Sequence, residues 1–374
     1  MLTFILGGAP ITNFLNYNYE VHILDPKYDG MEEVKDFLAK FDLYFEKDIK
    51  KTIVVRNSKE ILGTGSYSQN VIKDVAVDLN YQGQGILNTI ISKLKKIINN
   101  EGYSKIFVYT QATNAEKFKS LGFKEITRLN KYPVFMENSI KGIQYSINQK
   151  KEKVKKTIYN KFGSDSLENY DIASITVNCN PITNGHLYLI KKAAKENEIV
   201  IIFVLDEDLS LFPAEVRYNL VKKATSDIDN VIVVKAGEYM ISHATFPNYF
   251  IGPDNEDERN RIFAELDAKI FAEYYAKFLK INSRYVGEEP YSPVTAAYNK
   301  ALKKYLPKYN IDIKIIKRKK IKGKAISAST VRQYIRDDKM NKVKPLVPQT
   351  TYDYLESENS KQVIAKIKKN KTRH

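Results

Sequence analysis

Residues 178–186 have the sequence Asn-Cys-Asn-Pro-Ile-Thr-Asn-Gly-His, between the apolar run 172–177 and a segment of helical periodicity at 187–195. This pattern predicts a strand, a tight turn and a helix, because Pro181 and Gly185 are typical turn residues. The N–H groups that open such a helix attract anions. The stretch therefore predicts a turn that binds phosphate.

A second stretch, residues 326–332, has the sequence Ile-Ser-Ala-Ser-Thr-Val-Arg and follows the basic run 317–324. Its three hydroxyls and one guanidinium, at an expected helix start, can donate hydrogen bonds to phosphoryl oxygens. The basic run is either a solvated face or a group of charges that steers phosphates to these donors. Two anion-binding helix starts in one chain predict a nucleotide ligand.

From residue 172 onward, short apolar runs alternate with longer helical segments. We expect strands at 199–205, 231–234, 285–286 and 311–316, and helices at 214–225, 262–279 and 294–305. This alternation predicts a Rossmann-like parallel sheet in an α/β domain, whose ligands bind beyond the carboxyl ends of the strands. The turn at 178–186 falls at such an end.

Residues 1–145 predict a smaller α+β domain, in which β-branched runs surround one long amphipathic helix after Gly85. We expect a linker at 146–165, the parallel-sheet domain at 166–348 and a basic, frayed C-terminal tail at 349–374.

Composition limits the class of protein. With 374 residues and 43% hydrophobic residues the chain predicts a globular protein of more than one domain. No apolar stretch approaches the roughly 20 residues of a membrane span. The single cysteine excludes an internal disulfide and favours a cytoplasmic location. The net charge of +16 fits phosphorylated ligands, acidic proteins or nucleic acid. No nucleic-acid-binding motif is present, so nucleic acid is an unlikely partner and such a binder would be non-specific.

His186 and Cys179 are the two candidate reactive side chains of the turn. An imidazole directly after Gly185 can donate a hydrogen bond to an α-phosphoryl group and stabilise the charge that builds up during displacement. A packed or capping histidine is the alternative. For Cys179 a packed thiol is favoured over a nucleophile, because no base is left to activate it.

The stretch 183–186 resembles the HxGH signature of the nucleotidyltransferase superfamily, with Thr183 in the place of the first histidine, and 326–329 resembles the second signature of that superfamily. The sequence 181–186 is similar to that of phosphopantetheine adenylyltransferases. The resemblance implies that Thr183 and His186 are catalytic and that further residues bind ATP: Asn178, Asn180, Gly185, Ser327, Ser329, Thr330 and Arg332. Arg217 is expected to be a further phosphate or substrate contact, or else a solvated helix arginine.

Longer strings resemble the family of citrate (pro-3S)-lyase ligases, also called acetate:SH-citrate lyase ligases. The strings lie at 135–138, 204–210, 241–250, 286–299 and 346–348, so the resemblance covers nearly the whole chain. His243 departs from the arginine expected at its position. Within the fourth string, Gly287 and Glu288 are expected at adenine or ribose, or in a simple strand-end turn.

This resemblance implies an enzyme of citrate fermentation that activates citrate lyase. Acetate and ATP would give acetyl-adenylate and pyrophosphate, and the acetyl group would pass to the thiol of the phosphoribosyl-dephospho-coenzyme A arm on the acyl carrier subunit. Mg²⁺ would bind through the phosphates, because no carboxylate or Cys/His cluster has metal-site spacing. The alternatives are an adenylyltransferase of the phosphopantetheine or nicotinamide mononucleotide type, and a non-specific nucleic-acid binder.

In the first domain, residues 82–85, Gln-Gly-Gln-Gly, resemble the pyrophosphate loop of GNAT acetyltransferases, and residues 114–123 resemble a later signature of that fold. Leu87 stands where a small residue is expected. The resemblance implies that Gln82, Gly83 and Gly85 hold a diphosphate like that of coenzyme A. We therefore expect a GNAT-like domain that either cradles the prosthetic arm or serves as a scaffold that docks the carrier protein.

Overall fold

The computed structural model describes residues 19–130, 133–164, 166–206, 210–240, 246, 249, 251, 255–288 and 293–370, with only the backbone at 293 and 294. The chain divides into two compact units. The first contains residues 1–140 and 247–256, and the second contains residues 141–246 and 257–374. The chain therefore leaves the second unit once and returns to it.

The first unit is built on a mixed sheet, which has seven strands among the described residues. Its order is β1 (Glu20–Leu24), β2 (Lys51–Arg56), β3 (Ile61–Ser68), β4 (Val71–Val77), β5 (Lys105–Thr110), β7 (Val134–Ser139) and β6 (Lys124–Arg128). Neighbouring strands are antiparallel except for β4 and β5, which are parallel.

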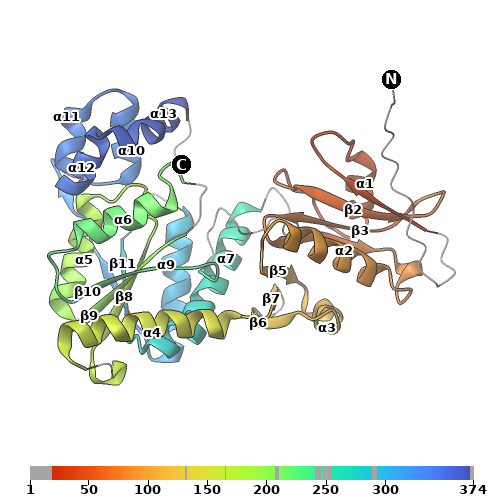
Figure 1. Cartoon of the computed structure of the whole chain (residues 1–374), viewed down its shortest axis with the longest axis horizontal. Helices are drawn as coiled ribbons and strands as arrows, with labels where there is room; N and C mark the ends of the chain where they lie inside the picture. Colours follow the sequence, from red (N-terminus) through yellow and green to blue (C-terminus); the bar gives the residue numbers. More distant parts are fainter. Residues whose placement is uncertain are drawn as a thin grey trace. The chain divides into compact units, whose positions relative to one another are not determined.

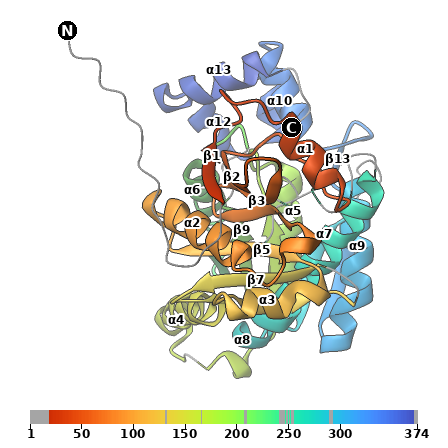
Figure 2. The same ribbon diagram turned by 90° about the vertical axis from the view of Figure 1, so that its right-hand side faces the viewer.

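Two helices cover the opposite faces of this sheet (Figure 2). Ile53 and Val55 pack with α2 (Ile86–Asn100), whereas Val54 between them packs with α1 (Glu32–Ala39). This arrangement follows from the pleat, because successive strand side chains point to opposite faces. A short helix, α3 (Ala115–Ser120), follows β5, and η1 (Leu79–Tyr81) and η2 (Ala112–Asn114) are 3-10 turns.

Strands β4 and β5 separate soon after they meet. Their register pairs only Val71 and Ile72 with Phe107 and Val108. The β3–β4 register shifts between Thr64 and Ser66, and Asp74 has a φ of 54°. Such a bulge bends the strand locally. The later residues of β4 therefore diverge from β5 and leave room between them.

The second unit is an α/β domain. Its sheet has five strands among the described residues, in the order β10 (Val231–Lys235), β9 (Ile199–Val204), β8 (Ile172–Val177), β11 (Ser283–Gly287) and β12 (Asp312–Ile316), all parallel. The strand order reverses between β8 and β11, so a ligand crevice is expected beyond the carboxyl end of β8. The fold class that the sequence predicts is confirmed.

Helices cover both faces of this sheet, and α10 to α13 gather at one end of the unit (Figure 1). The helices are α4 (Ile143–Phe162), α5 (Asn184–Glu196), α6 (Ala214–Ala224), α7 (Glu256–Ile270), α8 (Lys277–Leu279), α9 (Pro293–Tyr305), α10 (Ala328–Arg336), α11 (Met340–Val343), α12 (Gln349–Glu356) and α13 (Lys361–Lys369). A π-helical turn, η4 (Phe271–Ala276), joins α7 to α8. The 3-10 turns are η3 (Leu167–Asn169), η5 (Leu306–Tyr309), η6 (Lys344–Leu346) and η7 (Glu358–Ser360), and β13 (Lys320–Ile321) pairs with β14 (Lys324–Ala325).

Two expectations about connecting segments are wrong. Most of the expected linker 146–165 belongs to α4, whose Ile147, Val154 and Ile158 are buried at helical spacing. Most of the expected tail 349–374 forms α12 and α13. Val363 and Ile367 in α13 lie four residues apart and pack into the main core of the second unit. In both segments the many lysines conceal an apolar stripe that can be buried.

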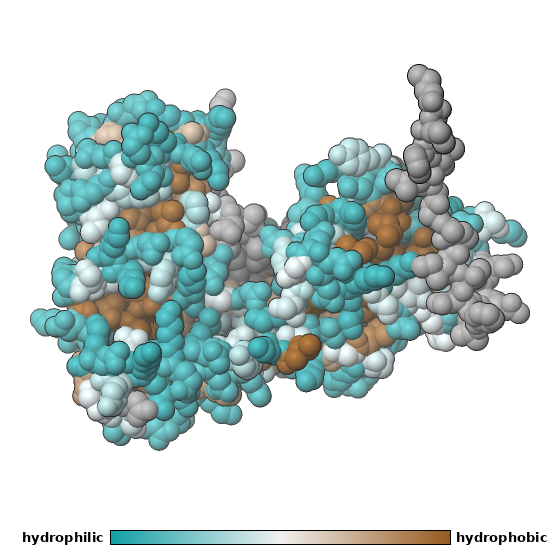
Figure 3. Space-filling model, in the orientation of Figure 1, coloured by the Kyte–Doolittle hydropathy of each residue, from teal (hydrophilic) through white to brown (hydrophobic). Residues whose placement is uncertain are grey.

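Hydrophilic residues cover most of the visible face of the second unit (Figure 3). Within the part of the chain that the structure describes, we find no helix with the length and apolar character needed to cross a membrane.

Candidate functional site

The turn after β8 ends in a capped helix start. Thr183 is the N-cap of α5, and its Oγ1 accepts a hydrogen bond from the backbone N–H of His186 at 3.4 Å. In return, the backbone N–H of Thr183 donates to Nδ1 of His186 at 3.0 Å. This reciprocal pair is a capping box, and it fixes the orientation of the imidazole.

The capping box also decides which ring nitrogen carries the proton. Because a backbone N–H can only donate, Nδ1 of His186 must accept, and the proton of the neutral ring lies on Nε2. Burial, with the charge of Arg318 as a smaller cause, lowers the pKa of His186 to about 4. At neutral pH, His186 is therefore an uncharged donor through Nε2.

Arg217 holds the first part of the turn. The side chain is 0% exposed. Its Nη1 donates to the backbone and side-chain oxygens of Asn178, at 3.0 and 2.6 Å, and to the carbonyl of Leu205 at 2.7 Å, while Nε donates to the carbonyl of Phe212 at 3.0 Å. The alternative of a solvated helix arginine is wrong. Its expected role as a phosphate contact stays a prediction, and these bonds favour a role in positioning Asn178.

The second helix start lies against the first. Ser327 is the N-cap of α10, and its Oγ accepts from the backbone N–H of Thr330 at 3.1 Å and lies 3.0 Å from Oγ of Ser329. Nη1 of Arg332, a side chain that is 6% exposed, donates to the carbonyl of Asn180 at 2.6 Å.

Gly185 lies where the start of α5 passes close to the segment that leads into α10. A Cβ at this glycine would lie 3.3 Å from the carbonyl oxygen of Ile326 and 3.4 Å from the Cβ of Ile326. A larger residue would push α5 away from the segment that leads into α10. The structure thus brings the stretches 178–186 and 326–332 together, as a shared nucleotide site requires.

Gly287 and Glu288 lie at the neighbouring strand end. Glu288 donates its backbone N–H to the carbonyl of Ile316 at 2.8 Å, and its own carbonyl accepts from Nε of Arg318 at 2.8 Å. The basic run 317–324 forms part of the hairpin β13–β14, which leads directly into Ser327. Sequence analysis did not single out Arg318, although it belongs to this basic run.

Cys179 is a packed thiol, as the sequence favours. It is buried in the core of the second unit, and burial raises the pKa of its thiol. In the described residues, no group of three or more His, Cys, Asp or Glu side chains could hold a metal ion. Residues 207–209, His243 with the rest of 241–245, and 289–292 lie outside the described residues.

The first unit contains a cavity of about 570 Å³ between the diverging ends of β4 and β5. Gln82, Gly83 and Gly85 line it, as do Asn114 and Lys117. Gly83 and Gly85 have φ values of 80° and 81°, which favour glycine. Gly85 is the N-cap of α2 and carries no side-chain cap, so the N–H groups of the first turn face the cavity region without a capping group.

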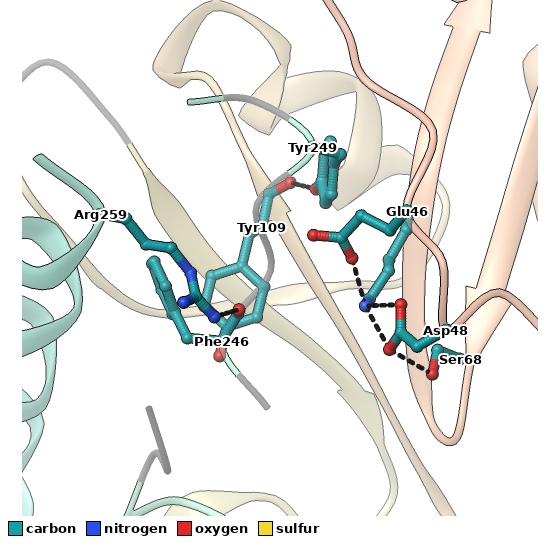
Figure 4. Close-up of polar contacts among 8 residues, drawn as sticks. Glu46, Asp48, Ser68, Tyr109, Phe246, Tyr249 and Arg259 are labelled. Carbon is teal, nitrogen blue, oxygen red and sulfur yellow. Dashed lines mark hydrogen bonds and ion pairs between the residues drawn. The ribbon is translucent and has the colours of Figure 1, made fainter. Parts of the chain in front are cut away.

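Tyr249, from the returning segment 247–256, closes part of the cavity wall. Its hydroxyl donates to the carbonyl of Tyr109, and its own carbonyl accepts from the N–H of Tyr44 at 2.9 Å. Figure 4 shows Tyr249 pointing at Tyr109, with Glu46, Asp48 and Ser68 nearby. Tyr249 could not be predicted from the sequence, because nothing local indicates that residue 249 belongs to the first unit.

Comparisons with known proteins agree with both units. A model of the citrate lyase ligase C-terminal domain matches residues 172–355, and a model of the GNAT acetyltransferase domain matches residues 23–148. A phosphopantetheine adenylyltransferase of Thermobifida fusca is 44% identical over 57 residues, which are 15% of this chain and 35% of that protein.

Two ligases match far more of the chain. The citrate (pro-3S)-lyase ligase of Escherichia coli K12 is 34% identical over 344 residues, which cover 90% of this chain and 93% of that protein. The enzyme of the same name from Haemophilus influenzae is 32% identical over 331 residues, which cover 86% and 94%. The chain therefore belongs to the citrate (pro-3S)-lyase ligase family, with an N-terminal GNAT domain and a C-terminal domain related to the nucleotidyltransferases.

Proposed function

We propose that this enzyme activates acetate with ATP and transfers the acetyl group to the thiol of the phosphoribosyl-dephospho-coenzyme A arm on the citrate lyase acyl carrier subunit. A carboxylate oxygen attacks the α-phosphorus of ATP, and the bond from that phosphorus to the β-phosphate oxygen breaks. The products are acetyl-adenylate and pyrophosphate. The thiol, losing its proton, then attacks the acetyl carbon, and AMP leaves.

His186 acts in the first step as an electrostatic donor. The neutral Nε2–H group donates to an α-phosphoryl oxygen, where negative charge builds up as the carboxylate attacks. No proton transfer from the ring is needed, and this suits a group with a pKa of about 4. Thr183 fixes the ring through the capping box.

The pyrophosphate is held by the second helix start. Ser329, Thr330 and the N–H groups at the start of α10 offer donors, and the basic run 317–324 supplies positive charge. Mg²⁺ would be held through the phosphates of ATP and not in a cage of protein ligands, and it would neutralise part of their charge. The adenosine would lie toward Gly287 and Glu288 at the end of β11.

One observation carries this proposal: the contact between the two helix starts, through Arg332 and Asn180 at 2.6 Å. A triphosphate spans several ångströms and needs donors at both ends. Because the starts of α5 and α10 are adjacent, they can bind the α- and γ-phosphates of one ATP molecule. Two helix starts on distant surfaces could not.

We further propose that the cavity of the first unit cradles the pantetheine and diphosphate portion of the prosthetic arm. The cavity of about 570 Å³ is large enough for a flexible cofactor arm, and the uncapped start of α2 suits a diphosphate. The scaffold that only docks the carrier protein is the alternative.

The test is ATP–pyrophosphate exchange with a panel of short carboxylic acids, run with and without deacetylated citrate lyase. We expect acetate-dependent exchange in the absence of the lyase, and thioester formation only in its presence. Exchange that needs no carboxylic acid, or that follows a phosphorylated acceptor, would favour a simple adenylyltransferase instead.

A further inference from the structure

A second arginine of the second unit is buried close to the carboxyl end of β8. Arg284 lies in β11, level with Ser174 of β8, and is 0% exposed. Its side chain runs toward the strand end, because Nη2 donates to Oγ1 of Thr176 at 2.9 Å. Thr176 comes two residues before Asn178, where the ATP-binding turn begins.

The polar contacts of Arg284 fix its orientation. Nη2 also donates to the hydroxyl of Tyr298 at 2.6 Å, and that hydroxyl donates to Oδ2 of Asp267 at 2.5 Å. The guanidinium carbon lies 3.9 Å from the ring centroid of Phe271. One nitrogen thus makes both hydrogen bonds, and an aromatic ring supports the plane of the group.

The other two guanidinium nitrogens have no hydrogen-bond partner in the described part of the chain. Nε and Nη1 of Arg284 are buried and have no partner among the residues that the structure describes. Buried donors without partners are costly, and more so when they belong to a charged group. Arg217, which is also 0% exposed, uses the same two nitrogens on Asn178, Leu205 and Phe212. A cost of this kind is expected where a side chain is kept for a ligand.

The surroundings indicate what such a ligand would be. The donors are cationic, so they favour an anion that can accept hydrogen bonds. The neighbouring groups are aromatic rings at Phe271 and Tyr298, and the thioether of Met240 lies 3.7 Å from Oγ1 of Thr176. A small anion with an apolar end, such as a short-chain carboxylate, matches both features, whereas a phosphate has no apolar end.

We propose that Arg284 binds the carboxylate of the acid substrate, with Tyr298 as the positioning residue that orients the guanidinium. This inference rests on the proposed function, because it assigns the acid in that reaction to a subsite beside the ATP-binding turn. One carboxylate oxygen accepts from the unpartnered edge of Arg284, and the other oxygen remains to attack the α-phosphorus.

The experiment compares Arg284→Met and Arg284→Lys with the wild type in ATP–pyrophosphate exchange. We expect the KM for acetate to rise by about 10- to 100-fold in Arg284→Met, which is the range of one charge-assisted hydrogen bond, while the KM for ATP changes little. Arg284→Lys keeps a charge but lacks the planar fork, so we expect a smaller rise. An unchanged KM for acetate in the Met variant would overturn the inference. Should Arg284→Met fail to fold, an unchanged KM for acetate in Arg284→Lys would overturn the inference.

Thermal unfolding separates a binding role from a structural one. Arg284→Met removes the hydrogen bonds to Thr176 and Tyr298 as well as two unpartnered buried donors, so the melting temperature of each protein without acetate is taken as its own baseline. Acetate should raise the melting temperature of the wild type and not that of Arg284→Met. An equal acetate-induced shift in both proteins would contradict the subsite.

Tyr298→Phe has a matched control in Tyr305→Phe. Both phenols lie on α9 and donate to a carboxylate, Tyr298 to Asp267 and Tyr305 to Glu265, but only Tyr298 contacts Arg284. We expect a raised KM for acetate in Tyr298→Phe alone. A wild type without acetate-dependent exchange would contradict the proposed function. Acetate-dependent exchange with an unchanged KM for acetate in both Arg284 variants would contradict only this inference.

Discussion

The helix starts that we propose as anion sites are built differently in the first and the second unit. Gly85 leaves α2 without a side-chain cap. By contrast, Thr183 and Ser327 cap α5 and α10 with their own hydroxyls. The first start offers backbone N–H groups alone, whereas the other two have part of their backbone already satisfied and present an imidazole and hydroxyls instead.

We propose that the two kinds of helix start have different tasks. The start of α2 binds a group that does not react, and the starts of α5 and α10 stabilise a group that does. Backbone amides at an uncapped start can grip a diphosphate that does not change during the reaction. A bond that breaks at phosphorus needs donors placed where charge develops, and side chains fixed by caps provide that precision. The comparison predicts that changes at α5 affect the chemical step, and that changes at α2 affect binding of the thiol substrate.

The largest effect is expected at His186. His186→Ala removes the Nε2–H donor, so the rate of acetate-dependent pyrophosphate exchange should fall by about 100- to 1000-fold. Lys368→Ala is the control, because this exposed lysine forms a surface ion pair with Asp338, and the exchange rate of that variant should match the wild type. Near-normal exchange by the histidine variant would remove the proposed distinction between the two kinds of helix start.

An intermediate effect is expected at the glycine turn. Gly83→Ala and Gly85→Ala should raise the KM for deacetylated citrate lyase several-fold and leave pyrophosphate exchange unchanged, because an alanine at positive φ costs about 1–2 kcal/mol and shifts the turn.

Gly102→Ala is the matched control for both. Gly102 has a φ of 92°, and a Cβ there would meet nothing within 4 Å, as at Gly83 and Gly85, but Gly102 does not line the cavity. Equal KM values for deacetylated citrate lyase in all three variants would mean that the first unit serves only as a scaffold.

A smaller effect is expected at the cap of α10. Ser327→Ala should lower the free energy of unfolding in urea by about 1 kcal/mol and raise the KM for ATP, because the cap and one phosphate donor are lost together. Ser226→Ala serves as the comparison, since this exposed hydroxyl bonds only the carbonyl of Lys223 at 3.0 Å. A Ser327 variant as stable as Ser226→Ala would show that the cap contributes little.

The smallest expected effect is that of pH. The pKa of His186 is lowered to about 4, so the ring is neutral throughout pH 5–8 and remains a donor. The kcat/KM for exchange, which reports the free enzyme, should therefore show no acid limb from this histidine. An inflection near pH 6.5 that is lost in His186→Gln would mean that the ring acts in its charged form.

Local motifs predicted the helix starts well, because a cap is decided by a few adjacent residues. Thr183, His186 and Ser327 occupy the positions at which the sequence placed a turn or a helix start. The parallel direction of the strands in the second unit also follows from the alternation of strands and helices.

Long-range partners could not be predicted in this way. Arg217 lies in a helix and Arg284 in a strand. Arg217 bonds three backbone carbonyls, whereas two nitrogens of Arg284 have no partner among the described residues, and no local motif indicates this difference. The segments that form α4 and α13 were predicted as a linker and a tail because their many lysines are typical of solvent-exposed segments. The helical spacing of their apolar residues was given less importance. Their buried residues recur at intervals of four and seven, as in Ile147, Val154 and Ile158, and this signal could have identified α4.

The return of residues 247–256 to the first unit has a consequence for synthesis on the ribosome. The nascent chain completes the described strands of the first sheet long before Tyr249 emerges, so part of the cavity wall in that unit is missing until then. In the second unit, Arg259 bonds the carbonyl of Phe246 at 2.9 Å and so ties together the two ends of the excursion (Figure 4). Neither half can be excised as a single uninterrupted fragment, and a gene split at residue 140 would yield a first product with an incomplete cavity.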